Sequence, residues 1–111
     1  MLKTNSSSKR PEVIDPQATA FLAKTLGDEN RLRIIMALKD GRKPVSRIVE
    51  ELGISQPLAS HHLKELKRAL LVAVERSGPF VFYELADPRI ITILNELDGL
   101  AGDLLTRRTV F

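Results

Sequence analysis

Apolar residues recur at helical spacing in the first third of the chain and predict two helices. Asp15 precedes Pro16, a pair that suits the N-cap and first position of a helix, and this segment ends at Gly27. Asp28 caps a second helix, which ends before Gly41. The apolar face of the second helix consists of Leu32, Ile35, Met36 and Leu38. We expect this face to lie in the core.

The middle of the chain has the pattern of a helix-turn-helix. After a turn at residues 42–44, the segment 45–52 predicts a short amphipathic helix that ends at Gly53. Ser55 then opens a longer helix over residues 55–70. In helix-turn-helix proteins the second helix enters the major groove of DNA, so the segment 55–70 is the candidate recognition helix.

The candidate recognition helix has two different faces when its residues are placed about 100° apart. We expect one face to lie in the core, and it consists of Ala59, Leu63, Leu66 and Leu70. The opposite face carries donors and cations: Pro57, Ser60, His61, Lys64 and Arg68, with Gln56 and Lys67 at its margin. Because early residues reach base edges most easily, we assign base readout to Gln56, Ser60 and His61, phosphate contact to Lys67 and Arg68, and an intermediate role to Lys64. A merely solvated basic face is the alternative.

Two runs rich in Val, Phe and Tyr, at residues 71–75 and 80–85, predict a β-hairpin. An isolated hairpin is unstable, so we expect it to pack on the helices as the wing of a winged helix. The turn supplies candidate minor-groove or phosphate contacts at Arg76, Ser77 and Gly78. Phe80 and Phe82 share one strand face, and the other face is apolar too. Wing packing is the favoured role for these rings, and exposure or ligand contact is the alternative.

The segment 87–105 predicts a final helix with more large aliphatic residues than one core-facing stripe uses. This excess predicts a partner helix, and dimerisation through the first and last helices explains it most simply. The candidate interface consists of Phe21, Leu22, Leu94, Leu97, Leu100 and Leu104.

Together these elements predict a mainly α fold with a small β-hairpin, an α+β winged helix-turn-helix of about five helices and a two-stranded wing. We expect one DNA-binding and dimerisation domain over residues 14–106. It lies between a flexible tail at 1–13 and a short tail at 107–111. Lys9 and Arg10 in the first tail are expected to be solvated, with DNA contact as the alternative.

The distribution of charge agrees with a polyanionic partner. The 111 residues carry 17 Lys plus Arg and 14 Asp plus Glu, a formal net charge of +3. Residues 42–70 hold six basic and three acidic side chains, whereas residues 87–105 hold one basic and four acidic ones. Neither a membrane span nor a signal peptide is predicted, so we expect a cytoplasmic protein.

The chain has no cysteine, which excludes disulfides, thiolate metal sites and thiol redox switching. The adjacent His61 and His62 diverge by about 100° on a helix and cannot chelate one ion together. We expect His62 to be a half-buried packing residue. With no glycine-rich phosphate loop and no nucleophile set beside a base, an enzyme is not expected, and neither is a cofactor or a bound metal.

Three strings together resemble the ArsR/SmtB family of bacterial repressors: FLAKTLGDENRLRIIMAL, IVEELGISQPLASHHLKELKRALLV, and the hairpin ending FVFYEL. The resemblance spans Phe21 to about Leu97. It implies a dimeric winged-helix protein that binds a double-stranded DNA operator and releases it when an effector binds.

This sequence departs from the family's pattern at several positions. Many relatives sense metals through Cys-Val-Cys where this chain has Pro44-Val45-Ser46, and others bind zinc through Asp and His on a final helix that here lacks histidine. Neither metal site is therefore expected. Relatives also have glycine where Leu70 stands, so a left-handed glycine cap is not expected there. The wing, ERSGPF, is less basic than theirs.

We therefore predict a sequence-specific DNA-binding regulator, a dimeric repressor that binds an operator through residues 55–70 and is released by a non-thiol signal. The alternative is a winged-helix protein-interaction module that binds a protein through the basic face or the final helix. The effector stays open among an apolar ligand near the dimer helices, a protein partner, a modification, and control by abundance alone.

Overall fold

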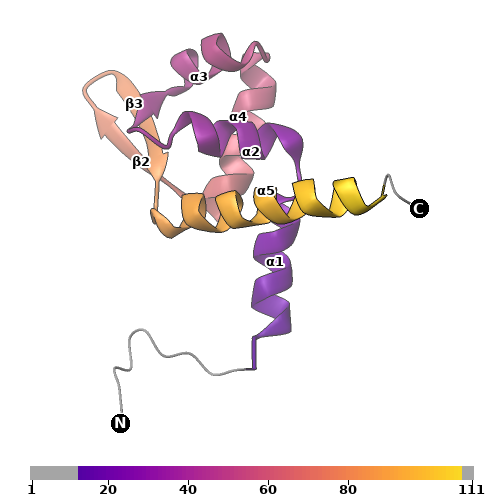
Figure 1. Ribbon diagram of the computed structural model, residues 1–111. Helices are drawn as coiled ribbons and strands as arrows, with labels where there is room; N and C mark the ends of the chain where they lie inside the picture. Colours follow the sequence, from indigo (N-terminus) through magenta and orange to yellow (C-terminus); the bar gives the residue numbers. More distant parts are fainter. Residues whose placement is uncertain (1–12, 109–111) are drawn as a thin grey trace.

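The computed structural model describes residues 13–108, which form five helices and three strands. In chain order they are α1 (Pro16–Leu26), α2 (Glu29–Ala37), β1 (Lys43–Pro44), α3 (Val45–Leu52), α4 (Gln56–Arg68), β2 (Val72–Ser77), β3 (Phe80–Leu85) and α5 (Arg89–Arg108). Figure 1 shows α2, α3 and α4 gathered beside the β2–β3 hairpin, with α5 crossing below them in this view and α1 projecting away. The predicted succession of helices and hairpin is confirmed.

Polar side chains begin three of the helices, as the sequence predicts. The Asp15 carboxylate accepts hydrogen bonds from the backbone N–H groups of Gln17 and Ala18 at 3.1 and 3.2 Å. Asp28 accepts from the Arg31 N–H at 3.1 Å, and the Ser55 hydroxyl accepts from the Leu58 N–H at 3.2 Å. These contacts satisfy N–H groups that have no partner within the helix, so the helices start where the caps stand.

One core lies between α2, α3, α4, the hairpin and the first turns of α5. Its fully buried large side chains are Ile34, Ile35, Leu38, Ile48, Leu63 and Leu66. Two core expectations were wrong. Met36 is 39% exposed while Ile34, outside the predicted face, is completely buried, so the inner face of α2 is rotated toward Ile34. Leu70 is 80% exposed, because α4 ends at Arg68.

The end of α4 corrects a second expectation about Leu70. Leu70 itself takes the left-handed conformation, with φ of 62°. Its N–H donates to the Lys67 carbonyl at 3.0 Å, and the Leu71 N–H donates to the Leu66 carbonyl at 2.9 Å. These two bonds form a Schellman motif, in which the position of Leu70 usually holds glycine. Leu71 and Leu66 are both buried, so apolar packing accompanies the motif.

The wing is a three-stranded antiparallel sheet with the order β1-β3-β2. The residues 42–44, expected as a turn, include β1, where Lys43 pairs with Tyr83 and Pro44 with Phe82. In the hairpin, Ser77 pairs with Phe80 across a two-residue turn whose first residue, Gly78, has φ of 60°. A positive φ at this position is typical of a type II′ turn, which suits the twist of paired strands.

The two faces of the hairpin have different surroundings. Tyr83 and Leu85 pack against the core, whereas Phe80 and Phe82 lie on the other face with ring centroids 6.2 Å apart. The Arg42 guanidinium carbon lies 4.3 Å from the centre of the Phe82 ring, and Phe80 is 57% exposed. The structure therefore separates the two rings: Phe82 is covered by a cation and Phe80 faces solvent.

Helix α5 extends further than expected, because Arg107 and Arg108 belong to it rather than to a tail. Ile90 and Leu94 attach its first half to the core, at 7% and 8% exposure. Residues 1–12 and 109–111 of the two expected tails, and with them Lys9 and Arg10, lie outside the described residues.

Candidate DNA-binding surface

The outer face of α4 presents every side chain of residues 55–70 that the sequence assigned to DNA contact. Opposite the buried Ala59, Leu63 and Leu66, the exposed residues are Gln56, Pro57, Ser60, His61, Lys64, Lys67 and Arg68. The helix follows the left-handed Gly53, which has φ of 66° and ends α3 with a bond from its N–H to the Val49 carbonyl at 2.9 Å. The tight glycine turn fixes α4 against α3 as a helix-turn-helix.

The cations of residues 42–70 differ in how far acidic neighbours neutralise them. Glu51 accepts from Lys43 at 2.7 Å and from Arg47 at 2.9 Å, and the bond from Lys43 lowers the pKa of this carboxyl below its usual range. Arg42 forms an ion pair with Glu75.

On α4 the neutralisation is weaker. Arg68 lies 3.3 Å from Glu65, while Lys64 and Lys67 form no ion pair with any residue between 13 and 108. The positive charge open to an anion is therefore concentrated on α4, more sharply than the sequence count indicates.

The wing contributes less to this surface. Arg76, Ser77 and Gly78 are exposed at the end of the hairpin, as expected. Arg76 forms no ion pair within the described part of the chain. Electrostatic attraction of the hairpin end to DNA would therefore depend on this one side chain. The neighbouring cation, Arg42, is neutralised by its ion pair with Glu75 and so adds little attraction for DNA.

Comparisons with known proteins agree with this geometry. Residues 28–74 match the model of a family described as bacterial regulatory protein, arsR family. The chain is 37% identical over 92 residues to the HTH-type transcriptional repressor SmtB of Mycobacterium tuberculosis, an alignment that covers 83% of this chain and 67% of SmtB. It is 36% identical over 85 residues to an uncharacterised HTH-type regulator, MJ1325 of Methanocaldococcus jannaschii, covering 76% and 96% of the two chains.

The chain belongs to the ArsR family.

A solved structure of the same type is HlyU from Vibrio cholerae, with a TM-score of 0.67 and 31% identity over 73% of this chain and 91% of HlyU. The homodimeric winged helix-turn-helix DNA-binding domain Mb0332 from Mycobacterium bovis has a TM-score of 0.71 at 24% identity, covering 88% and 95%. The fold of this ArsR-family regulator is therefore the winged helix-turn-helix, as the sequence predicts.

At the positions where relatives bind metals, this regulator has side chains that are not metal ligands or that are bonded to other residues. Pro44 and Val45 form the end of β1 and the start of α3. Just before α5, Asp87 accepts three hydrogen bonds from the Arg89 guanidinium, the shortest at 2.8 Å, and these bonds lower the pKa of the Asp87 carboxyl. Among residues 13–108 no three His, Cys, Asp or Glu side chains are placed to hold a metal ion.

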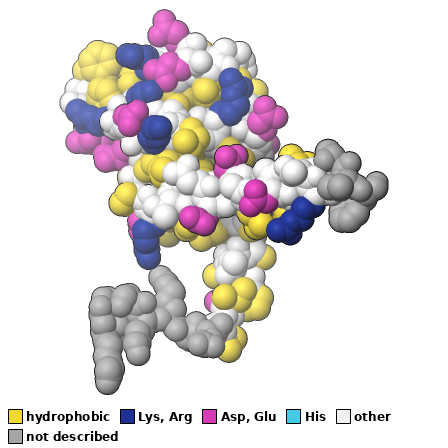
Figure 2. Space-filling model, in the orientation of Figure 1, with side chains coloured by type: hydrophobic (Ala, Val, Ile, Leu, Met, Phe, Trp, Pro, Cys, Tyr) yellow, Lys and Arg dark blue, Asp and Glu magenta, His cyan; other side chains and the backbone are white. Residues whose placement is uncertain are grey.

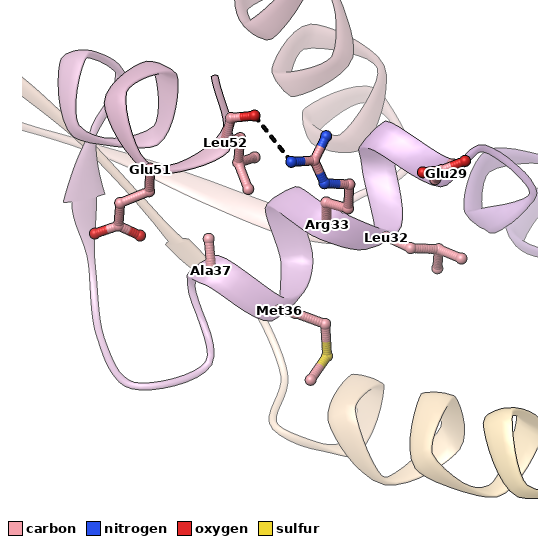
Figure 3. A pocket seen from close by; sticks show the side chains of 7 residues that line it. All are labelled: Glu29, Leu32, Arg33, Met36, Ala37, Glu51 and Leu52. Carbon is pink, nitrogen blue, oxygen red and sulfur yellow. Dashed lines mark hydrogen bonds between the residues drawn. The ribbon is translucent and has the colours of Figure 1, made fainter. Parts of the chain in front are cut away.

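A surface hollow of about 490 Å³ lies between α2 and α3 of the regulator (Figure 3). The Arg33 guanidinium crosses it and donates to the Leu52 carbonyl at 2.8 Å, which joins α2 to the end of α3. The hollow is lined by Glu29, Leu32, Arg33, Met36, Ala37, Glu51 and Leu52. No helix in the part of the chain between residues 13 and 108 is long and apolar enough to cross a membrane.

Sequence reasoning missed the surroundings of His62. This residue was expected to be half-buried, but it is only 6% exposed and contacts Arg31 and Asp28 on α2. The signal in the sequence was the spacing of Asp28 and Arg31, which brings both onto the first turn of one helix. Their pairing with His62, which follows Asp28 by 34 positions and Arg31 by 31, could not be inferred from local patterns.

Proposed function

We propose that this chain is a dimeric repressor that binds a double-stranded DNA operator with the outer face of α4 in the major groove. The observation that carries the proposal is the exposed face of α4, where Lys64 and Lys67 lack acidic partners among residues 13–108 and Gln56, Ser60 and His61 can reach bases. Several relatives support repression, since SmtB and the Bacillus subtilis protein SdpR are both named as transcriptional repressors.

The apolar surface of α1 and α5 supports the dimer. Figure 2 shows hydrophobic side chains along α1 and along the side of α5 next to it. Five predicted interface residues are 40 to 51% exposed, far more than large apolar side chains usually are: Phe21, Leu22, Leu97, Leu100 and Leu104. The sixth, Leu94, is only 8% exposed and packs in the core of its own chain, because it lies on the inner side of α5. Mb0332 is a homodimer, which agrees with this assembly.

We further infer that a signal other than thiol chemistry releases the operator, because the 111 residues include no cysteine. A regulator of this type needs no catalytic centre, and it acts in the cytoplasm, where bacterial DNA is. A hollow of about 390 Å³ between α1 and α5, lined by Leu22, Leu26, Ile93 and Leu97 among others, supports an apolar effector as one source of the signal.

Selection of binding sites from a random DNA library, followed by titration at fixed salt, tests operator binding. We expect a two-half-site sequence that is bound at least about 10³-fold more tightly than random DNA. The double variant Lys64→Glu, Arg68→Glu is expected to lose this binding. Affinity no higher than for random DNA would contradict the proposal. Loss of a protein partner in the double variant, with DNA binding intact, would instead identify a protein-interaction module.

A further inference from the structure

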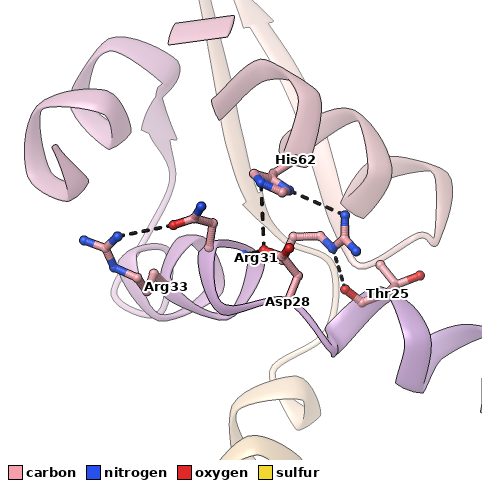
Figure 4. Close-up of polar contacts among 6 residues, drawn as sticks. Thr25, Asp28, Arg31, Arg33 and His62 are labelled. Atoms are coloured by element: carbon pink, nitrogen blue, oxygen red, sulfur yellow. Dashed lines mark hydrogen bonds and ion pairs between the residues drawn. The ribbon is translucent and has the colours of Figure 1, made fainter. Parts of the chain in front are cut away.

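A partly buried polar cluster lies where α1, α2 and α4 meet (Figure 4). It contains His62 of α4, Arg31 of α2, the cap residue Asp28, and Thr25 in the last turn of α1. His62 and Thr25 are only 6% and 8% exposed. None of these side chains belongs to the DNA-facing surface, although His62 follows His61 directly in the sequence.

The first link of the cluster joins α4 to α2. A terminal nitrogen of Arg31 lies 3.4 Å from Nδ1 of His62. Arginine can only donate hydrogen bonds, so Nδ1 is the acceptor and the proton of the neutral ring is on Nε2. Nε2 lies 3.8 Å from a carboxylate oxygen of Asp28. Arg31 and Asp28, both at the start of α2, therefore orient the His62 ring from its two sides.

The second link joins the same guanidinium to α1. Nε of Arg31 donates to the backbone carbonyl of Thr25 at 2.6 Å. The Thr25 hydroxyl in turn donates to the carbonyl of Phe21 at 3.0 Å. Phe21 belongs to the apolar face proposed as the dimer interface. Hydrogen bonds therefore join α4 through Arg31 to Thr25 in the last turn of α1, one helical turn after Phe21.

The hydrogen bonds at this junction restrict the angle between the helices more than apolar packing does. Apolar contacts are nearly independent of orientation, so packed helices can rotate slightly at little cost. A planar guanidinium that bonds two different helices fixes their relative angle, because rotation would leave buried donors unsatisfied. The other inward residues of α4, Ala59, Leu63 and Leu66, are apolar.

We propose that His62 and Arg31 are positioning residues that hold the recognition helix at a fixed angle to α1, and so set the half-site spacing that the dimer accepts. This inference rests on the proposed function, because spacing has meaning only for a dimer on DNA. In a dimer joined through α1 and α5, the angle between α1 and α4 determines how far apart, and how rotated, the two recognition helices lie.

The test uses synthetic duplexes that carry the two half-sites selected by the wild-type protein, with the spacer unchanged or lengthened by one or two base pairs. Each added base pair moves one half-site by about 3.4 Å and rotates it by about 35°. For the wild type we expect at least about a tenfold loss of affinity for the first added base pair. For His62→Leu and Arg31→Lys we expect a loss of only about two- to threefold. Lysine keeps the charge of Arg31 but cannot bond both helices in one plane.

Two control variants separate positioning from a general loss of folded protein. His62→Asn keeps an acceptor near the position of Nδ1 and is expected to restore the wild-type spacing preference. Arg33→Met removes a guanidinium from the same helix that bonds Asn30 and the Leu52 carbonyl, and so ties α2 to α3 rather than to α1. It is expected to keep the wild-type preference at a lower unfolding temperature.

The outcomes distinguish the two proposals. If the wild type selects no operator, the proposed function and the positioning role both fail. If it selects an operator but accepts all spacers equally, only the positioning role fails. If the wild type discriminates and His62→Leu discriminates as strongly, only the positioning role fails. An equal loss of affinity on every duplex would also overturn it, because a reduced folded fraction acts alike on all DNA.

Discussion

At the scale of single residues, Leu70 shows how the surrounding structure can override a local preference. A left-handed conformation costs a non-glycine residue roughly 1–2 kcal/mol. At Leu70 this cost is offset by the two Schellman hydrogen bonds and by the burial of the next residue, Leu71, beside Leu66. The Leu70 side chain is 80% exposed and gains little from packing.

We therefore expect Leu70→Gly to stabilise the protein. Glycine relieves the left-handed strain but adds freedom to the unfolded chain, so the free energy of unfolding is expected to rise by about 0.5–1 kcal/mol. Urea denaturation followed by circular dichroism measures it. Gly53→Ala is the reverse case at φ of 66°, and a loss of about 1 kcal/mol is expected. A destabilised Leu70→Gly would mean that the exposed side chain makes a stabilising contact in the dimer.

His62 gives the stability a pH dependence. Burial lowers the pKa of His62 below its ordinary value of about 6.5, more than the nearby Asp28 carboxylate raises it. The unfolded chain therefore binds a proton at a higher pH than the folded chain does. The free energy of unfolding is expected to have its full value above pH 6.5, where His62 is neutral in both states. It should fall as the pH drops from the pKa of His62 in the unfolded chain to its lower pKa in the folded chain.

Urea midpoints at pH 7.5 and at pH 5 measure this dependence, with His62→Asn as the variant that cannot titrate. The difference between the two midpoints is expected to shrink in His62→Asn and to persist in His61→Asn, whose ring is exposed. Asp28 and Asp87 titrate in a more acidic range, because hydrogen bonds lower their pKa values below the ordinary range of aspartate. An unchanged pH dependence in His62→Asn would contradict the assignment.

At the scale of elements, local signals predict where helices begin and end, and nonlocal pairing explains what they miss. Asp15, Asp28, Ser55 and Gly53 each act on their own turn, so a window of a few residues contains the whole cause. Strand β1 is different. Lys43 and Pro44 extend because Tyr83 and Phe82 lie opposite, some 40 positions further along the chain.

The candidate site divides in the same way. The outward arc of α4 follows from the helical repeat alone, so its residues could be named from the sequence. The distribution of ion pairs could not, because Glu51 and Glu75 neutralise cations on other elements. The burial of His62 and the exposure of Met36 likewise depend on how α2 is rotated against α4. Tertiary packing sets that rotation, and the periodicity of α2 leaves it undetermined.

Within α4, early and late residues are expected to affect DNA binding differently. Lys67→Ala removes the proposed phosphate contact, so it should weaken binding to all sequences and reduce the slope of log K against log salt concentration by about 1. Ser60→Ala removes the proposed base contact, so it should leave the slope unchanged and cost about 1–3 kcal/mol on the selected operator only. Titrations at four salt concentrations, on operator and random duplexes, separate the two. Equal slopes for wild type and Lys67→Ala would contradict phosphate contact by Lys67.

At the scale of the whole molecule, the two ends of the domain have opposite chemistry. Two cations without acidic partners in the described chain, Lys64 and Lys67, lie side by side on α4, whereas the only cation of residues 87–105, Arg89, is paired with Asp87. The remaining carboxylates of that segment, Glu96, Asp98 and Asp103, give α5 a negative surface beside its leucines. We therefore expect DNA to be attracted to α4 and repelled from α5, which leaves the apolar side of α5 for a second copy of the chain.

This arrangement means that a substitution on α5 can weaken dimerisation without unfolding the protomer. Leu94 and Ile90 hold α5 to the core, while Leu100 is 51% exposed and lies outside the core that residues 13–108 form. In a twofold dimer each substitution acts twice, and each fully buried leucine contributes about 1.5–3 kcal/mol. Leu100→Glu is therefore expected to weaken dimerisation at least about 100-fold in sedimentation equilibrium. Thr92→Glu, on the same helix facing Leu38 and Leu85, is expected to leave it unchanged.

The Leu100→Glu variant also shows which part of operator affinity comes from pairing two protomers. A folded monomer still has the exposed face of α4, so it should bind one half-site as the wild type does. On the full operator it should lose the additional affinity that comes from joining two sites at a fixed distance. A variant that remains dimeric would place the interface elsewhere. A monomer that binds the full operator as tightly as the wild type would show that the two half-sites are read independently.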